Sequence, residues 1–167
     1  MAQQTPRGVA TIIWAALLAG PTMFLGVALF LVVGIRGGVG LGEPRAAPAL
    51  IGASAGLSVV TVALSWLWAV RMRIARPAQG SVARRGAASF PPGPEADALT
   101  RLIVSCAHCE GGALFAVIAF MRTGHMLALA PYALCWLALA AHFPGSRHWA
   151  QLTGAPAVAP RNPMIRG

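Results

Sequence analysis

Glu110 is the residue of this chain with the clearest capacity for chemistry, because it is the only carboxylate within an apolar segment. It lies in the middle of residues 102–121, a segment long enough to span a membrane. Along a helix it stands about 13 Å from Arg101 and about 18 Å from Arg122, so neither arginine reaches it. A charge near the bilayer midplane is costly. We therefore expect the carboxyl to be protonated, paired with another helix, or in contact with water or a bound cation.

Two uses of this carboxyl follow from its surroundings. Gly111 and Gly112 come directly after Glu110, and their missing side chains open a groove in which another helix backbone can approach closely. A protonatable site that binds and releases a proton or cation is one hypothesis. A protonated glutamic acid that holds helices together is the other, and His108 is its possible polar partner at similar depth.

Three cysteines, Cys106, Cys109 and Cys135, lie in apolar segments, and their odd number argues against a disulfide framework. On a helical wheel His108 points almost opposite to the two cysteines beside it, so this helix alone cannot close around a metal ion. A c-type haem motif has His directly after the second Cys, where this chain has Glu110. A metal or haem site would need Cys135 or a histidine from another helix. We expect no cofactor, and the cysteines are predicted to pack as small apolar residues.

The composition indicates an integral membrane protein, since 57% of the residues are apolar and only 10% are charged. All 13 basic residues are arginines, which together with much Ala, Gly and Pro suggests a bacterial source and hence the cytoplasmic membrane. The net charge of +9 does not indicate nucleic-acid binding. The arginines flank apolar segments, where they orient the protein and attract anionic lipid headgroups.

Hydropathy, together with the Gly, Pro and charged residues between the apolar segments, predicts an all-α bundle of four transmembrane helices within residues 1–149. The predicted spans are residues 9–35, 49–70, 102–121 and 126–143. Residues 71–100 form a basic, largely irregular connection, and residues 150–167 form a tail rich in Pro and Arg. The N-terminus, the long connection and the tail fall on one side and hold most of the arginines, so both termini are predicted to be cytoplasmic.

Small residues predict where the helices pack closely. Gly52 and Gly56 in the second helix have the small-xxx-small spacing that lets two backbones approach. The adjacent Gly111 and Gly112 in the third helix are predicted to pack because their missing side chains let another backbone come close.

Two resemblances add to this interpretation. The segment GASAG from Gly52 to Gly56, an arginine-bearing connection and RLIVSCAHCEGGALFAVIAFM together resemble the helical hairpin of the rotor-ring subunit of rotary ATP synthases. That resemblance implies that Glu110 is the ion-binding carboxylate. The chain is also similar to uncharacterised small four-helix bacterial membrane proteins whose third helix carries E-G-x-x-L-F, here starting at Glu110, a similarity that implies no activity.

The sequence shows no nucleophile with its base, no paired carboxylates and no phosphate-binding loop, so we do not expect an enzyme. We expect a non-enzymatic accessory or assembly subunit, in which a buried mid-membrane glutamate takes part in helix packing. Its partner would be another membrane protein or a second copy of the chain. The alternative is a proton or cation carrier that uses Glu110.

Overall fold

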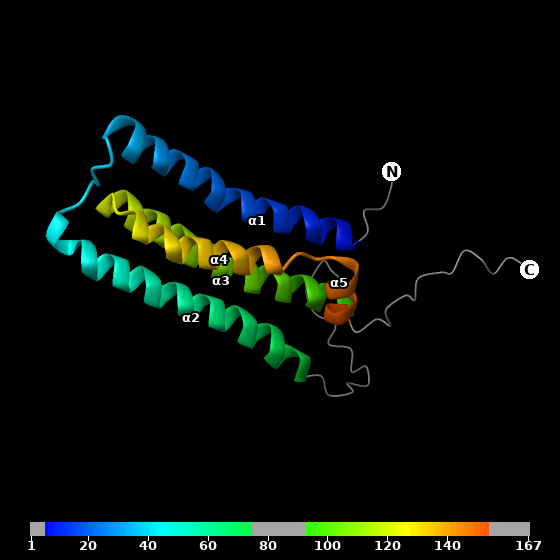
Figure 1. Cartoon of the computed structure of the whole chain (residues 1–167). Coiled ribbons are helices and arrows are strands. Elements are labelled where there is room, and N and C mark those ends of the chain that lie inside the picture. The colour runs from blue at the N-terminus through cyan, green and yellow to red at the C-terminus, as the bar shows by residue number, and fades with distance from the viewer. Residues whose placement is uncertain (1–5, 75–92, 154–167) are drawn as a thin grey trace, which may run out of the picture.

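The computed structural model describes residues 6–74 and 93–153, and every regular element in these ranges is helical. The elements are α1 (Pro6–Leu29), which continues as a π-helix η1 (Phe30–Ile35), η2 (Pro44–Ala46), α2 (Ala47–Ile74), α3 (Pro94–Thr123), η3 (Met126–Ala128), α4 (Leu129–Ala141) and α5 (Ser146–Thr153). In Figure 1, α3 and α4 lie between α1 and α2, and α5 covers one end of the bundle. The start of α1 and the end of α2 lie at that same end. α3 is the central helix, because it packs against each of the other four.

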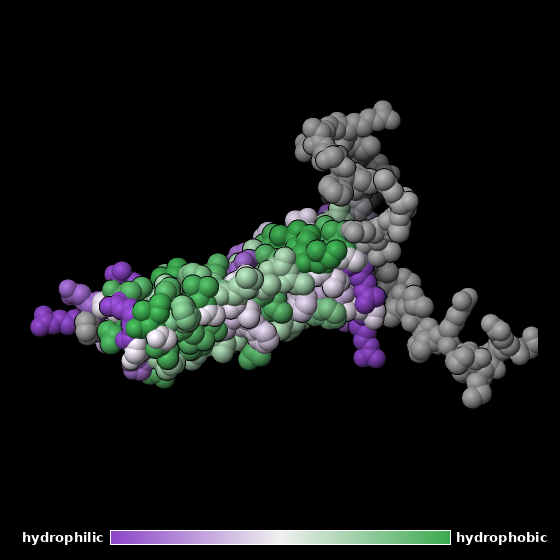
Figure 2. Space-filling model, turned by 90° about the horizontal axis from the view of Figure 1, so that it is seen from above, coloured by the Kyte–Doolittle hydropathy of each residue, from purple (hydrophilic) through white to green (hydrophobic). Residues whose placement is uncertain are grey.

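Three helical stretches are long and apolar enough to cross a membrane, namely Pro6–Ile35, Ala47–Trp68 and Pro94–Thr123. α4 has only 13 residues, which corresponds to about 20 Å. The chain then bends by 76° into α5. If α4 and α5 are taken together as a single broken span, the structure has four candidate spans. On the face shown in Figure 2 the middle of the molecule is mostly apolar, and most of the hydrophilic residues lie at the two ends. The predicted all-helical, apolar architecture is confirmed at this level.

The long connection differs from its prediction at both ends. α3 begins at Pro94, eight positions before the predicted residue 102, and α2 runs to Ile74. Pro94 at the start of α3 suits the first turn, and Glu95 and Asp97 face the positive end of the helix dipole. Hydropathy marks where the apolar segment begins, whereas these capping features mark where the helix begins. Residues 75–92 of the predicted irregular connection lie outside the described residues.

The tail also begins with a helix that the prediction missed. α4 ends at Ala141 rather than residue 143, and α5 covers Ser146–Thr153, across the predicted limit of the domain at residue 149. α5 has an apolar side: Leu152 is 3% exposed and Trp149 packs against the cluster that contains Leu102. Tertiary packing of this side against the bundle stabilises the short helix. The rest of the tail, residues 154–167, lies outside the described residues.

The interface of α2 and α3 consists of small residues in a heptad pattern. On α2 the hydroxyl side chains recur at intervals of four, three and four residues, at Ser54, Ser58, Thr61 and Ser65. The buried small residues of α3 keep the same intervals, at Ser105, Cys109, Gly112 and Ala116. A repeat of 3.5 residues keeps such a seam facing its partner along the whole contact. The small side chains let the two backbones run close together.

The connection between α1 and α2 closes over the C-terminal end of α3. The backbone amides of Leu41 and Gly42 donate to the carbonyls of Met121 and Arg122, at 2.8 and 2.6 Å. α3 ends at Thr123 and is capped by Gly124, which has φ of 65° and donates to the Phe120 carbonyl, the arrangement typical of a glycine helix cap. A Cβ on Gly40 would overlap the backbone at Thr123, so this close approach requires glycine.

Candidate functional site

Glu110 lies at the edge of α3 that faces α1. Its side chain is half-buried, and a Cβ placed on Gly20 of α1 would stand 3.2 Å from Oε1 of Glu110. Any side chain at position 20 would therefore crowd the carboxyl. Gly20 is exposed and leaves the carboxyl a place against the α1 backbone.

The part of α1 beside Glu110 is more polar than its sequence suggests. Pro21 is buried and has no backbone N–H, so the Leu17 carbonyl one turn earlier loses its usual intrahelical donor. The Thr22 hydroxyl donates to the Leu18 carbonyl at 2.8 Å and accepts from the indole N–H of Trp136 of α4 at 3.1 Å. The middle of α1 thus carries polar groups close to Glu110, although Thr22 itself is exposed.

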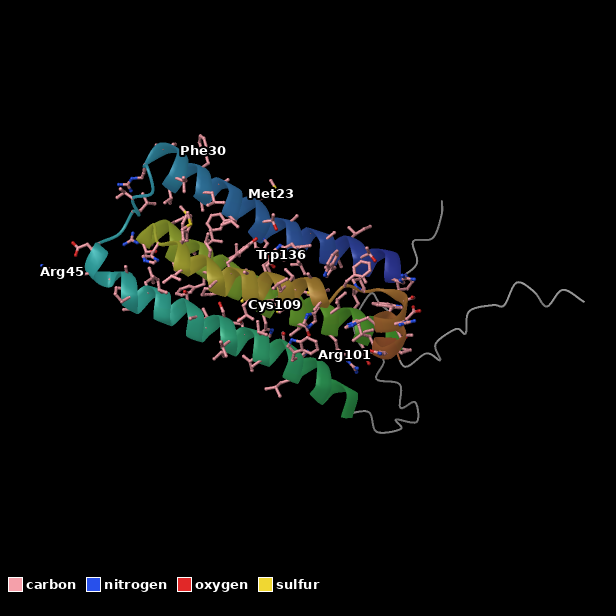
Figure 3. The ribbon with its side chains drawn as sticks, viewed as in Figure 1. Met23, Phe30, Arg45, Arg101, Cys109 and Trp136 are labelled. Atoms are coloured by element: carbon pink, nitrogen blue, oxygen red, sulfur yellow. The ribbon has the colours of Figure 1, made fainter. Side chains whose placement is uncertain are left out.

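Within the described residues, no side chain donates a hydrogen bond to Glu110 or forms an ion pair with it. The Glu110 carboxyl therefore lies at the edge of the bundle, close to the α1 backbone on one side and exposed on the other. Gly111, directly after it, is exposed, and no atom of the described chain comes within 4 Å of a Cβ placed there. The neighbouring surface is apolar: Met23 of α1 is 73% exposed and points away from the bundle in Figure 3. We call Gly20, Met23, Ala107, Glu110 and Gly111 the α1–α3 edge.

His108 does not serve as the partner of Glu110 in the described chain. Its Nδ1 lies 2.7 Å from the carbonyl of Val104 on the same helix. The two side chains are also two residues apart on one helix, which turns them about 200° from each other. Helix geometry keeps the two side chains of one chain on opposite sides of α3, and a role of His108 as a polar partner stays a prediction.

The cysteines lie in the packed interior. Cys106, Cys109 and Cys135 are all fully buried. Cys135 Sγ lies 3.9 Å from Thr61 Oγ1 and 4.0 Å from the Ser58 carbonyl, which are contacts of a small side chain in a helix interface. In the part of the chain that the structure describes, no group of three or more His, Cys, Asp or Glu side chains is arranged to hold a metal ion.

The glycines predicted to pack divide into two kinds. A Cβ on Gly112 would lie 2.5 Å from Thr61 Oγ1 and 2.7 Å from Cys135 Sγ, so Gly112 is the close contact among α2, α3 and α4. Gly52, Gly56 and Gly111 are exposed, with no atom of the described chain within 4 Å of an added Cβ. α2 instead presents its serine side to α3. A packing role for these three glycines stays a prediction that concerns contacts outside the described chain.

Sequence reasoning missed two features that shape the site. One is Gly20, whose proximity to Glu110 depends on the register of α1 against α3 and leaves no local signal in the sequence. The hydroxyl seam of α2 extends to Thr61 and Ser65, beyond the GASAG segment. Its four-three-four spacing is the signal that could have found it.

Comparison with known proteins gives no match to a family model, to a curated protein or to a solved structure. The resemblances stated from the sequence therefore stay predictions, and function must be argued from the site.

Proposed function

We propose that this protein is a non-enzymatic accessory or assembly subunit of a complex in a bacterial cytoplasmic membrane. In this proposal the α1–α3 edge receives a transmembrane helix of a partner. One observation carries it: the Glu110 carboxyl lies half-buried at the edge of α3, and no described side chain of its own chain donates to it. A polar group at that depth is costly without a partner.

The chemistry of the edge suits a helix contact. A protonated carboxyl both donates and accepts a hydrogen bond, so Glu110 can pair with a hydroxyl, an amide or a second carboxyl. Gly20 and Gly111 flank it without side chains, so an incoming backbone can come close. The partner's contact surface is then expected to hold small residues around one polar group. A second copy of this chain also meets that description, through Glu110 of each copy.

The proposed topology has four spans with both termini in the cytoplasm. α4 and α5 together make the fourth span: α4 runs back to the end where α1 begins, and the bend turns α5 across that end. Arg7 of α1 lies at that end and its Nε donates to the carbonyl of Pro144, 3.3 Å away. The described arginines at the other end are Arg36, Arg45 and Arg122. The end that α5 covers already holds more, namely Arg7, Arg71, Arg73, Arg101 and Arg147, and residues 75–92 and 154–167 add five further arginines to the proposed cytoplasmic side.

Substitution of Glu110 tests the proposal. We expect Glu110→Gln to keep the native complex on a blue native gel of gently solubilised membranes, because glutamine keeps the shape and hydrogen-bonds in both directions. Glu110→Ala should reduce the complex, since it leaves a partner group unpaired at a cost of roughly 1–3 kcal/mol. Glu95→Gln, at the exposed start of α3, is the matched control and should change nothing. A complex that survives Glu110→Ala in full yield contradicts the proposal.

The second candidate function is a proton or cation carrier, and the open position of Glu110 favours it. A carrier site must exchange its ion, and a carboxyl at an edge can be reached from outside the bundle. In that case Glu110→Gln should abolish ion transfer while the complex assembles normally. A carbodiimide should also label the wild type in a pH-dependent manner. Pairing with a partner helix predicts poor labelling at every pH until the complex is dissociated.

A further inference from the structure

Arg101 is a buried cation without a partner in the described chain. Its side chain is only 6% exposed, and its Nε has no hydrogen-bond acceptor. Among the described acidic residues, Glu95, Asp97 and Glu110 lie on the same helix, but none of them forms an ion pair with Arg101; Glu95 and Asp97 are exposed, and Glu110 lies nine residues further along α3. Glu43 lies beyond the opposite end, in the connection before α2. A buried positive charge without a neighbouring anion is strongly unfavourable, so we expect an anion to bind beside Arg101.

The position of Arg101 identifies its depth in the membrane. Arg101 lies one helical turn before Ser105, whose hydroxyl donates to the carbonyl of Ser65 on α2 at 3.3 Å. The side of α3 that carries Arg101 therefore faces α2, toward the end that α5 covers, as Figure 3 shows. Tryptophans mark this level: Trp66 follows Ser65, and Trp149 packs against the cluster that contains Leu102.

Tryptophan is enriched at the level of the lipid headgroups, so the Arg101 side chain lies at the depth of the lipid phosphates rather than at the midplane. Basic pockets between transmembrane helices at this depth bind the headgroups of anionic lipids. A guanidinium is also well suited to the task, because its planar set of donors matches two oxygens of a phosphate.

We propose that Arg101 binds the phosphate of an anionic phospholipid between α2 and α3, beside α5. The same chemistry is offered by inorganic phosphate in solution. The interfacial depth and the apolar surface of α2 favour a lipid, whose acyl chains would lie along exposed residues such as Leu64 and Leu57, which share one side of α2. This site is separate from the α1–α3 edge and does not depend on the function proposed for Glu110.

The test uses the full chain purified in an uncharged detergent. Native mass spectrometry and thermal unfolding are measured with added phosphatidylglycerol, with phosphatidylcholine, and with inorganic phosphate. We expect phosphatidylglycerol to stay bound and to raise the unfolding temperature more than the other two. Arg101→Gln should weaken phosphatidylglycerol binding on the order of tenfold or more. Arg45→Gln, an exposed arginine at the opposite end of the bundle, is the matched control and should bind as the wild type does.

Three outcomes would overturn the proposal. They are equal binding of phosphatidylglycerol by Arg101→Gln and the wild type, equal protection by phosphatidylcholine, and equal protection by inorganic phosphate, which would place the ligand in solution. If Arg101→Gln does not fold, Arg101→Lys carries the test. It keeps the charge but loses the paired donors, so it should bind phosphatidylglycerol more weakly than the wild type. Unchanged affinity in that variant would also count against the site.

Discussion

Replacement of Gly112 by alanine should destabilise the bundle, whereas the same change at the adjacent Gly111 should not. A Cβ at Gly112 would meet Thr61 Oγ1 at 2.5 Å and Cys135 Sγ at 2.7 Å, distances at which something must move. A Cβ at Gly111 would meet no atom of the described chain within 4 Å. The two positions lie in the same helix and differ only in the side of α3 that they face.

The size of the effect follows from the difference between the two variants. Alanine in place of glycine gains up to about 1 kcal/mol of helix propensity at either position, so this gain cancels in the comparison. What remains is the overpacking at Gly112, which typically costs about 1–3 kcal/mol. We therefore expect Gly112→Ala to be less stable than Gly111→Ala by about that amount.

The assay is unfolding of the purified protein in mixed detergent micelles, followed by circular dichroism. Removing the obstructing atoms should restore stability: in Gly112→Ala with Thr61→Ala, the nearest atom left on residue 61 is a Cβ at 3.6 Å, an ordinary contact. Cys135→Ala removes the other obstruction. A favourable coupling between these changes in a mutant cycle would support the packing. Equal stability of Gly111→Ala and Gly112→Ala would refute the reasoning.

Two further predictions concern the hydroxyl seam and the topology. The Ser58 hydroxyl is buried without a hydrogen-bond partner among the described residues, so Ser58→Ala should leave the thermal unfolding temperature unchanged or raise it. Ser65→Ala removes a bond of 2.7 Å to the Val62 carbonyl and should destabilise by roughly 0.5–1 kcal/mol; the reverse order of the two variants would contradict this account. For topology, single cysteines at Gly80 and at the C-terminus should react with a membrane-impermeant reagent only from the cytoplasmic side, and one at Gly40 only from the opposite side. Labelling of Gly80 and Gly40 from the same side would exclude the proposed spans.

The helical architecture was predictable because apolar segments of membrane length leave few alternatives. Residues 9–35 differ little from the observed stretch Pro6–Ile35, since Arg7 and Arg36 delimit the apolar segment and the helix begins only one residue before Arg7. The helix that starts at Pro94 begins before the apolar segment, and hydropathy alone does not predict the polar first turns of a helix. α5 is too short and too polar to be predicted as a span from hydropathy. It is stabilised by the packing of Leu152 and Trp149 against apolar side chains of the bundle.

The site was predictable only in part. Glu110 stood out because a carboxylate in an apolar segment is rare, and that signal is local. The contact with Gly20 depends on how α3 is rotated against its neighbours, whereas the separation from His108 follows from the geometry of α3 alone. Gly52 and Gly56 show the limit of a spacing motif, since the spacing indicates a surface that permits close approach but does not choose the neighbour. In this chain the serine side of α2 faces α3.

The most direct test of the account is photo-crosslinking from the α1–α3 edge in native membranes. A photoreactive amino acid at Ala107, an exposed position one turn before Glu110, is compared with one at Val60 on the exposed surface of α2. The account predicts one discrete protein adduct from Ala107, either with another protein or with a second copy. This adduct should persist in Glu110→Gln and disappear in Glu110→Ala, and Val60 should give none. No adduct from Ala107, or one that survives Glu110→Ala, would contradict the claim that Glu110 holds a partner helix at this edge.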